Sequence, residues 1–252
     1  MSKRLADTTA LFELHAGTAS TRKQAQKLLQ PTADVETSEH VLREWKRILF
    51  EAVRVIEEAA DTEPDVSALL SRMALGYFRQ PAQRLRALAI IVGGSSTTDM
   101  VAIKVRAGQL LRGDAERLLR ASVSAVKRTS DCGLAKQVAQ QTPSGWTLKV
   151  TCKKREGICG HEERIEQQLA RWRAGAAALR ASDRYATMGT VAEQMAASPR
   201  DRTGSNCFNK TGDLAIAMDC NEGDVIVTTD RSFETMAQAM NFGVARIDTT
   251  QS

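Results

Sequence analysis

The most constraining feature of this sequence is the segment Asp224–Asp230 (DVIVTTD), which contains a continuous run of β-branched and apolar residues. A strand with one exposed face alternates apolar and polar residues, whereas a strand covered on both faces is apolar throughout. The segment therefore predicts a buried parallel strand, whose sheet needs helices on both faces. A helical pattern at Ser232–Asn241 and a final strand at Val244–Asp248 fit this arrangement.

The start of the chain shows the same alternation of strands and helices. Short strands are predicted at Lys3–Asp7 and Asp34–Thr37. Ser38 is a suitable N-cap for the amphipathic helix that follows the second strand. This order at both ends of the chain predicts an α/β fold, in which a parallel sheet carries helices on both faces.

The middle of the chain has a different pattern. Glu57–Arg128 is helical in pattern almost throughout, Trp146–Cys152 predicts a strand, and Glu162–Arg184 predicts a strong helix. We therefore expect one domain with a large, mostly helical insertion. The expected core comprises residues 1–58 and 200–252, and the expected insertion comprises residues 59–199.

Charge is distributed unevenly along the 252 residues, whose net charge is +5. Basic residues dominate Gly76–Arg128, whereas acidic residues dominate from Asp201 to the end. A basic middle beside an acidic end indicates a polyanion held near carboxylates, although a solvated helical face would give the same count.

Several classes of protein are disfavoured by the sequence. No apolar stretch approaches the roughly 18 residues of a membrane span, and the N-terminus has no apolar signal region. Five cysteines are too few for a disulfide scaffold, and neither a Walker A motif nor a Rossmann glycine fingerprint is present. We expect a reduced, cytoplasmic protein with no membrane partner.

Four acidic residues lie at predicted strand ends or one helical turn beyond them. Asp7 and Asp230 close strands, Glu44 lies in the helix after the second strand, and Asp213 begins a helical stretch. Any one of them alone is better explained as a helix cap. Together they predict a site for Mg²⁺ or Mn²⁺, because ligands bind at the carboxyl ends of parallel strands and hard cations prefer several oxygen ligands.

These acids lie in four segments that resemble the motifs of the PIN-domain nucleases, in the same order. The segments are Ala6–Leu11 (ADTTAL), Thr37–Glu44 (TSEHVLRE), Gly212–Ala217 (GDLAIA) and Val227–Phe233 (VTTDRSF). The resemblance covers about the first fifty and the last fifty residues. It implies metal-dependent endonucleolytic cleavage of RNA, giving a 3′-hydroxyl and a 5′-phosphate.

The resemblance also implies roles for individual residues. Asp7 and Asp213 would be direct ligands of the metal, and Glu44 and Asp230 would complete the site directly or through water. The hydroxyls of Thr9 and Thr229 could orient a carboxylate, a water or a phosphate, although both are equally good turn and capping residues. Independently of the resemblance, the basic helices of the middle segment could hold the phosphate backbone of the substrate through Arg79, Arg84, Arg86, Arg112 and Arg120. Lys210 could contact the scissile phosphate or merely solvate its loop.

A second metal is considered for the cysteines. Cys132, Cys152, Cys159 and His161 could bind a structural Zn²⁺, since thiolates and imidazoles are its usual ligands. The six-residue spacing between Cys152 and Cys159 is longer than that of a common zinc knuckle, so unligated thiols are the favoured interpretation.

Three functions remain open from the sequence. The first is an endoribonuclease; in a toxin-like variant of this function, an inhibitory protein partner would restrain the acidic cleft. The second is a DNA-directed nuclease of the same kind in repair or defence, because the same carboxylates would cleave DNA. The third is a non-catalytic module that binds nucleic acid or protein. The sequence leaves the oligomeric state undetermined.

Overall fold

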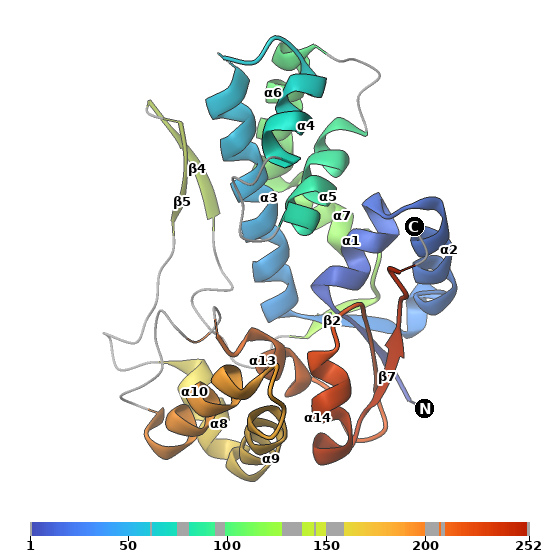
Figure 1. The fold of residues 1–252 in the computed structure, drawn as a ribbon, viewed down its shortest axis with the longest axis vertical. Coiled ribbons are helices and arrows are strands. Elements are labelled where there is room, and N and C mark those ends of the chain that lie inside the picture. Colours follow the sequence, from blue (N-terminus) through green and yellow to red (C-terminus); the bar gives the residue numbers. More distant parts are fainter. Residues whose placement is uncertain are drawn as a thin grey trace.

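Figure 1 shows the fold of the chain in a computed structural model, which describes residues 2–60, 62–74, 81–93, 99–127, 138–143, 145–149, 159–199, 207 and 210–250. Five parallel strands form one sheet with the order β3-β2-β1-β6-β7. The strands are β1 (Arg4–Ala6), β2 (Val35–Ser38), β3 (Ala125–Lys127), β6 (Val225–Thr228) and β7 (Gly243–Arg246). The prediction of an α/β fold with a parallel sheet flanked by helices is confirmed.

The strands β1 and β6 are neighbours at the centre of the sheet, with Leu5 opposite Ile226. From β1 the chain moves outward to β2 and β3, and from β6 it moves the other way to β7. Right-handed crossovers in opposite directions place their helices on opposite faces of the sheet. The carboxyl ends of β1 and β6 therefore form a topological switch point, which is where open α/β sheets bind ligands.

Three helices connect the first strands. They are α1 (Thr8–Ala16), α2 (Ala19–Leu28) and α3 (Glu39–Ala60). Asp7 caps α1 by accepting the backbone N–H of Thr9 at 3.4 Å, and Ser38 Oγ accepts the N–H of Val41 at 3.2 Å in α3. Both caps follow directly from the ends of strands, so each strand leads straight into a helix.

The long helix α3 extends away from the sheet and carries a group of shorter helices (Figure 1). These are α4 (Val66–Ala74), α5 (Pro81–Val92), α6 (Met100–Gln109), η2 (Leu110–Asp114) and α7 (Ala115–Ala121). Trp45 is fully buried in α3, stacks near Phe12 and donates its indole N–H to the carbonyl of Ala115 at 2.8 Å. This single side chain therefore ties α1 and α7 to α3. The hairpin of β4 (Val138–Thr142) and β5 (Gly145–Lys149) lies beside α3.

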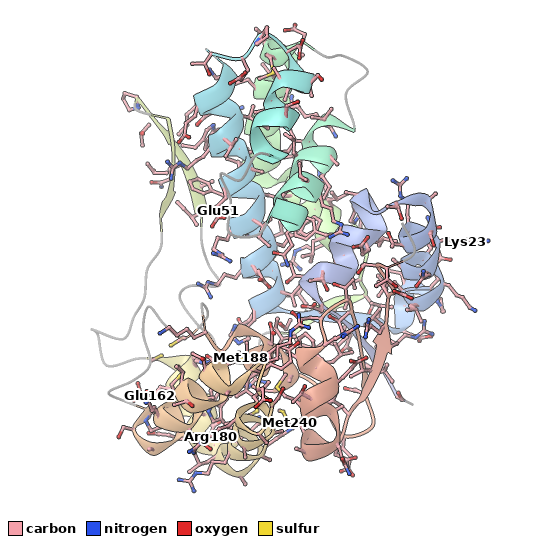
Figure 2. All side chains as sticks on the ribbon, in the orientation of Figure 1. Lys23, Glu51, Glu162, Arg180, Met188 and Met240 are labelled. Atoms are coloured by element: carbon pink, nitrogen blue, oxygen red, sulfur yellow. The ribbon has the colours of Figure 1, made fainter. Side chains whose placement is uncertain are left out.

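A second group of helices lies on the other side of the sheet (Figure 1). Its members are α8 (Gly160–Gln167), α9 (Leu169–Arg180), α10 (Ala186–Ala197), α13 (Gly212–Ala217) and α14 (Ser232–Met240). Trp172 is fully buried and donates its indole N–H to the carbonyl of Ala192 at 2.8 Å, which joins α9 to α10. Gly175 lies against Leu214 and Met240, because a Cβ there would come within 2.6 Å of both side chains. Figure 2 labels Met240 within this group of helices. Among the described residues, no helix has the length and apolar character required to cross a membrane.

Two predictions about the middle of the chain are wrong in detail. Glu57–Arg128 is not helical to its end, because Ala125–Lys127 forms β3 and pairs with β2. The sheet therefore takes an edge strand from within residues 59–199, which the sequence assigned to an insertion. The predicted helix Glu162–Arg184 is two helices that meet at Gln168. The break lets α8 bury Arg164 in an ion pair with Asp219 while α9 buries Trp172.

A candidate four-carboxylate site at the switch point

The four predicted acidic residues all come from elements that meet near the carboxyl ends of β1 and β6. Asp7 directly follows β1, and Asp230 lies two residues beyond β6. Glu44 lies in the second turn of α3, and Asp213 lies in the first turn of α13. The structure thus brings together residues that are distant along the chain.

Hydroxyl groups from both strands hold the carboxylate of Asp7. Thr9 Oγ1 and Thr228 Oγ1 each donate a hydrogen bond to Asp7 Oδ2 at 2.8 Å. Thr228 Oγ1 in turn accepts the backbone N–H of Asp230 at 2.9 Å, and Thr9 Oγ1 accepts that of Thr229 at 3.0 Å. Asp7 is therefore fixed by the segment that also carries Asp230.

Each of the other three acids is held in a similar way. Glu44 Oε2 accepts a hydrogen bond from Thr8 Oγ1 at 2.7 Å, and Asp213 Oδ2 accepts one from Ser232 Oγ at 2.6 Å. Asp230 Oδ1 accepts the backbone N–H of Ser232 at 2.9 Å. Within the described part of the chain, these bonds engage one oxygen of each carboxylate. The second oxygens lie outside this set of bonds, namely Asp7 Oδ1, Glu44 Oε1, Asp213 Oδ1 and Asp230 Oδ2.

The carboxylates also perturb one another electrostatically. Burial raises the pKa of Asp7 to about 6, and the Glu44 carboxylate is the next cause. Burial also raises the pKa of Asp213 well above its usual range, with further contributions from Asp230, Asp7 and Glu44. Ionisation of Asp7 and of Asp213 is therefore costly in this environment, and a nearby cation would offset that cost.

The raised pKa of Asp7 predicts a pH-dependent stability difference for the variant Asp7→Asn. A folded-state pKa of about 6, against an ordinary value of 3.8, favours the folded protein when the group is protonated. That stabilisation is complete below about pH 4 and is lost as the pH rises to about 6. Above pH 6 we expect the free energy of unfolding of Asp7→Asn to exceed that of the wild type by up to about 3 kcal/mol. The reason is that asparagine stays neutral and still caps α1.

The measurement is urea unfolding in EDTA between pH 4 and pH 8. The difference between Asp7→Asn and wild type should shrink towards zero at pH 4. The variant Asp34→Asn, at an exposed acid of the short helix η1 (Thr32–Asp34), is the matched control and should show no such trend. A constant difference across this pH range would contradict a repelled carboxyl at Asp7.

The donor set fits a hard divalent cation in its chemistry. Four carboxylates, each steadied through one oxygen, are the type of ligand that Mg²⁺ and Mn²⁺ prefer. In the described ranges, no group of three or more His, Cys, Asp or Glu side chains lies in an arrangement that could hold a metal ion. The fit to a cation is therefore one of chemistry, in the type of the donor atoms.

Some residues of the site were missed by sequence reasoning. The strand-borne hydroxyl that contacts Asp7 belongs to Thr228, whereas Thr229 joins the network through its backbone N–H. Successive side chains of a strand point to opposite faces, which accounts for the shift by one residue. Tyr185, from the loop before α10, donates its hydroxyl to Asp230 Oδ1 at 3.4 Å, and Arg184 lies over its ring. Burial and the Asp230 charge raise the pKa of Tyr185.

The predicted basic residues are largely bound to neighbours. Arg86 forms an ion pair with the buried carboxylate of Glu13, and Arg120 forms one with Glu116 at 2.8 Å. Arg112 lies 5.5 Å from the ring centre of Trp146 and donates to Gln141 at 2.9 Å. Lys210 is exposed just before α13, close in sequence to Asp213. Arg79 and the side chain of Arg84 lie outside the described residues.

The predicted zinc ligands are only partly described. Cys132 and Cys152 lie outside the described residues, so the zinc site stays a prediction. Cys159 precedes α8 and is a free thiol, and His161 is buried in the first turn of that helix. The ring of His161 lies 5.5 Å from that of His40 and 5.6 Å from that of Trp172. Its described surroundings are therefore a packed core.

The four carboxylates and their hydroxyl partners are thus the most complete chemical site of the described chain. Comparisons of the chain with models of protein families, with curated proteins and with solved structures found no match.

Proposed function

We propose that this protein is a divalent-cation-dependent nuclease that hydrolyses phosphodiester bonds in RNA. The observation that carries the proposal is the clustering of carboxylates from separate segments at the switch point of the sheet. Besides burial, Glu44 raises the pKa of Asp7, and Asp230, Asp7 and Glu44 raise the pKa of Asp213. A structural role explains this clustering poorly, because clustered carboxylates destabilise the folded state. Destabilising clusters of charge of this kind are typical of sites that bind a ligand.

In this proposal, Asp7 and Asp213 hold the cation, and Glu44 and Asp230 complete its surroundings directly or through water. The chemistry that such a cation supplies is a lowered pKa for bound water and neutralisation of charge on a phosphate. Thr9 and Thr228 orient Asp7, and Ser232 orients Asp213. These hydroxyls fix one oxygen of each ligand, so that little reorganisation is needed when the substrate arrives.

The decisive experiment uses the full chain with matched RNA and DNA oligonucleotides that carry labels at one end. We expect cleavage of RNA with Mg²⁺ or Mn²⁺ and no cleavage in EDTA. The products should carry a 5′-phosphate and a 3′-hydroxyl, which ligation and phosphatase treatment would reveal.

The other outcomes separate the alternative functions. Faster cleavage of DNA than of RNA would indicate that DNA is the substrate and that the cation-dependent chemistry is the same. Binding of oligonucleotides without cleavage at any metal concentration would contradict an enzyme and favour a non-catalytic module. Equal cleavage by the wild type and Asp7→Asn would indicate a contaminating nuclease.

A further inference from the structure

A cavity of about 710 Å³ lies where α1 and α2 meet α5, α6, η2 and α7. Its volume is within the range of pockets that bind small molecules. None of its lining residues belongs to the four-carboxylate site described above. The apolar part of its wall comprises Ala16, Ala89, Ile90, Leu110, Leu118 and Ala121.

The charged residues of the cavity are mostly cations. Arg22, Arg106 and Arg117 line it together with one acid, Asp114. Arg117 forms an ion pair with Asp114, so these two charges offset each other. The net charge of the described lining is then carried by Arg22 and Arg106.

Both of these arginines are held by uncharged groups. Arg106 donates its Nε–H to the carbonyl of Ile91 at 2.7 Å, and Arg22 donates from Nη2 to the carbonyl of Gly17 at 3.1 Å. A carbonyl carries no net charge, so these bonds fix the direction of each guanidinium without neutralising it. Oriented guanidinium groups match the oxygens of a phosphate and can also stack on a planar ring.

The remaining polar residue of the wall, His15, does not add a further charge. Its Nε2 lies 2.9 Å from Ser122 Oγ, and its ring centre lies 5.7 Å from that of Trp45. Burial and the nearby Arg22 lower the pKa of His15 to about 4, so the imidazole is neutral at pH 7. It presents a flat, uncharged surface beside the two cations.

We propose that this cavity binds a nucleoside monophosphate, with the phosphate on Arg22 and Arg106 and the planar base along the apolar wall beside His15. An inorganic anion alone would leave the apolar wall exposed to water, and an apolar ligand alone would leave both cations without an anionic partner. A ligand with a planar body and one anionic end satisfies both parts of the cavity. The proposal concerns a site separate from the carboxylates and does not depend on nuclease activity.

The test is calorimetric titration of the full chain in EDTA at pH 7.5. Without a divalent cation the four carboxylates repel a phosphate, so they do not contribute a binding site. We expect one saturable site for adenosine or uridine monophosphate, with adenosine and inorganic phosphate binding at least about tenfold more weakly. Decanoate, an anion with an apolar chain but no planar ring, should also bind at least about tenfold more weakly than the nucleoside monophosphates.

Two substitutions test whether the nucleotide binds in the cavity. Arg106→Ala removes the better-held cation, and Ala89→Trp fills the cavity from an exposed helical position that tolerates a large side chain. Each should weaken nucleotide binding by about tenfold or more, whereas Arg54→Ala, at an exposed arginine of α3 outside the cavity, should not. Asp213→Asn should bind the nucleotide as the wild type does.

The proposal is overturned if no nucleotide saturates, if Arg106→Ala and Ala89→Trp both bind like the wild type, or if decanoate binds as tightly as the nucleotides. Melting curves of each variant show that it remains folded. Absence of nucleotide binding would not argue against nuclease activity, and absence of RNA cleavage would not argue against nucleotide binding. The two proposals are therefore judged independently.

Discussion

Replacing Asp213 with asparagine should reduce cleavage of RNA by about 10²–10³-fold, the usual loss when a main electrostatic contributor to a transition state is removed. Asp213 is the carboxylate whose pKa is raised by burial and by all three of the other acids. In the proposal it is also a direct ligand of the cation, so its loss removes a main part of the cation site. The measurement is the single-turnover rate at saturating Mn²⁺.

The same substitution should leave the fold intact or make it more stable. Asparagine removes one of four repelling charges while keeping an acceptor for the hydroxyl of Ser232. Asp248→Asn, at a carboxylate near the C-terminal end that bonds to Thr250, is the matched control and should cleave at the wild-type rate. If Asp213→Asn is inactive but melts at a much lower temperature, loss of structure rather than loss of a ligand explains the result.

Replacing Gly189 with alanine should lower the free energy of unfolding by about 3 kcal/mol, at the upper end of the usual cost of overpacking. A Cβ on Gly189 would lie 2.2 Å from the backbone nitrogen of Arg180 and 2.5 Å from its Cα. Those atoms belong to the end of α9, so no side-chain rotation can relieve the clash. The helix α10 must therefore move away from α9, which weakens the packing around Trp172.

Urea unfolding monitored by tryptophan fluorescence measures this effect. Gly212→Ala is the matched control, because a Cβ there meets nothing within 4 Å and alanine favours the helix α13. This control should be neutral or slightly stabilising. If both variants lose stability equally, backbone freedom of glycine rather than the close approach of the two helices would be the cause.

The parts of the fold that could be predicted are those whose pattern is complete within one segment. The run of apolar residues in β6 predicts a strand from the local sequence alone, and the periodic residues of α14 predict a helix in the same way. The edge strand β3 does not, because its three residues follow a helical stretch and are stabilised by pairing with β2. Ser124 also donates its N–H to the carbonyl of Val35 at 2.7 Å. Such a strand depends on a partner that lies distant in the sequence.

The candidate site shows the same limit. Its acids could be predicted because strand ends converge in a parallel sheet. The contact of Tyr185 with Asp230 could not be predicted, since the loop that carries Tyr185 has no pattern pointing to the sheet. The ion pair of Arg86 with the buried Glu13 could not be predicted either. From the sequence alone, an arginine on a helix face is expected to be free to bind phosphate, because its partner in the fold is not known.

The pairing of β1 with β6 has a consequence for the newly made protein. Thr228 and Asp7, which are hydrogen-bonded, lie 221 residues apart. During synthesis on the ribosome, a growing chain carries Asp7 and Glu44 long before Asp213 and Asp230 have been translated. The four-carboxylate site can therefore form only after the chain has been synthesised as far as Asp230, so a product that ends before this residue would lack the assembled site.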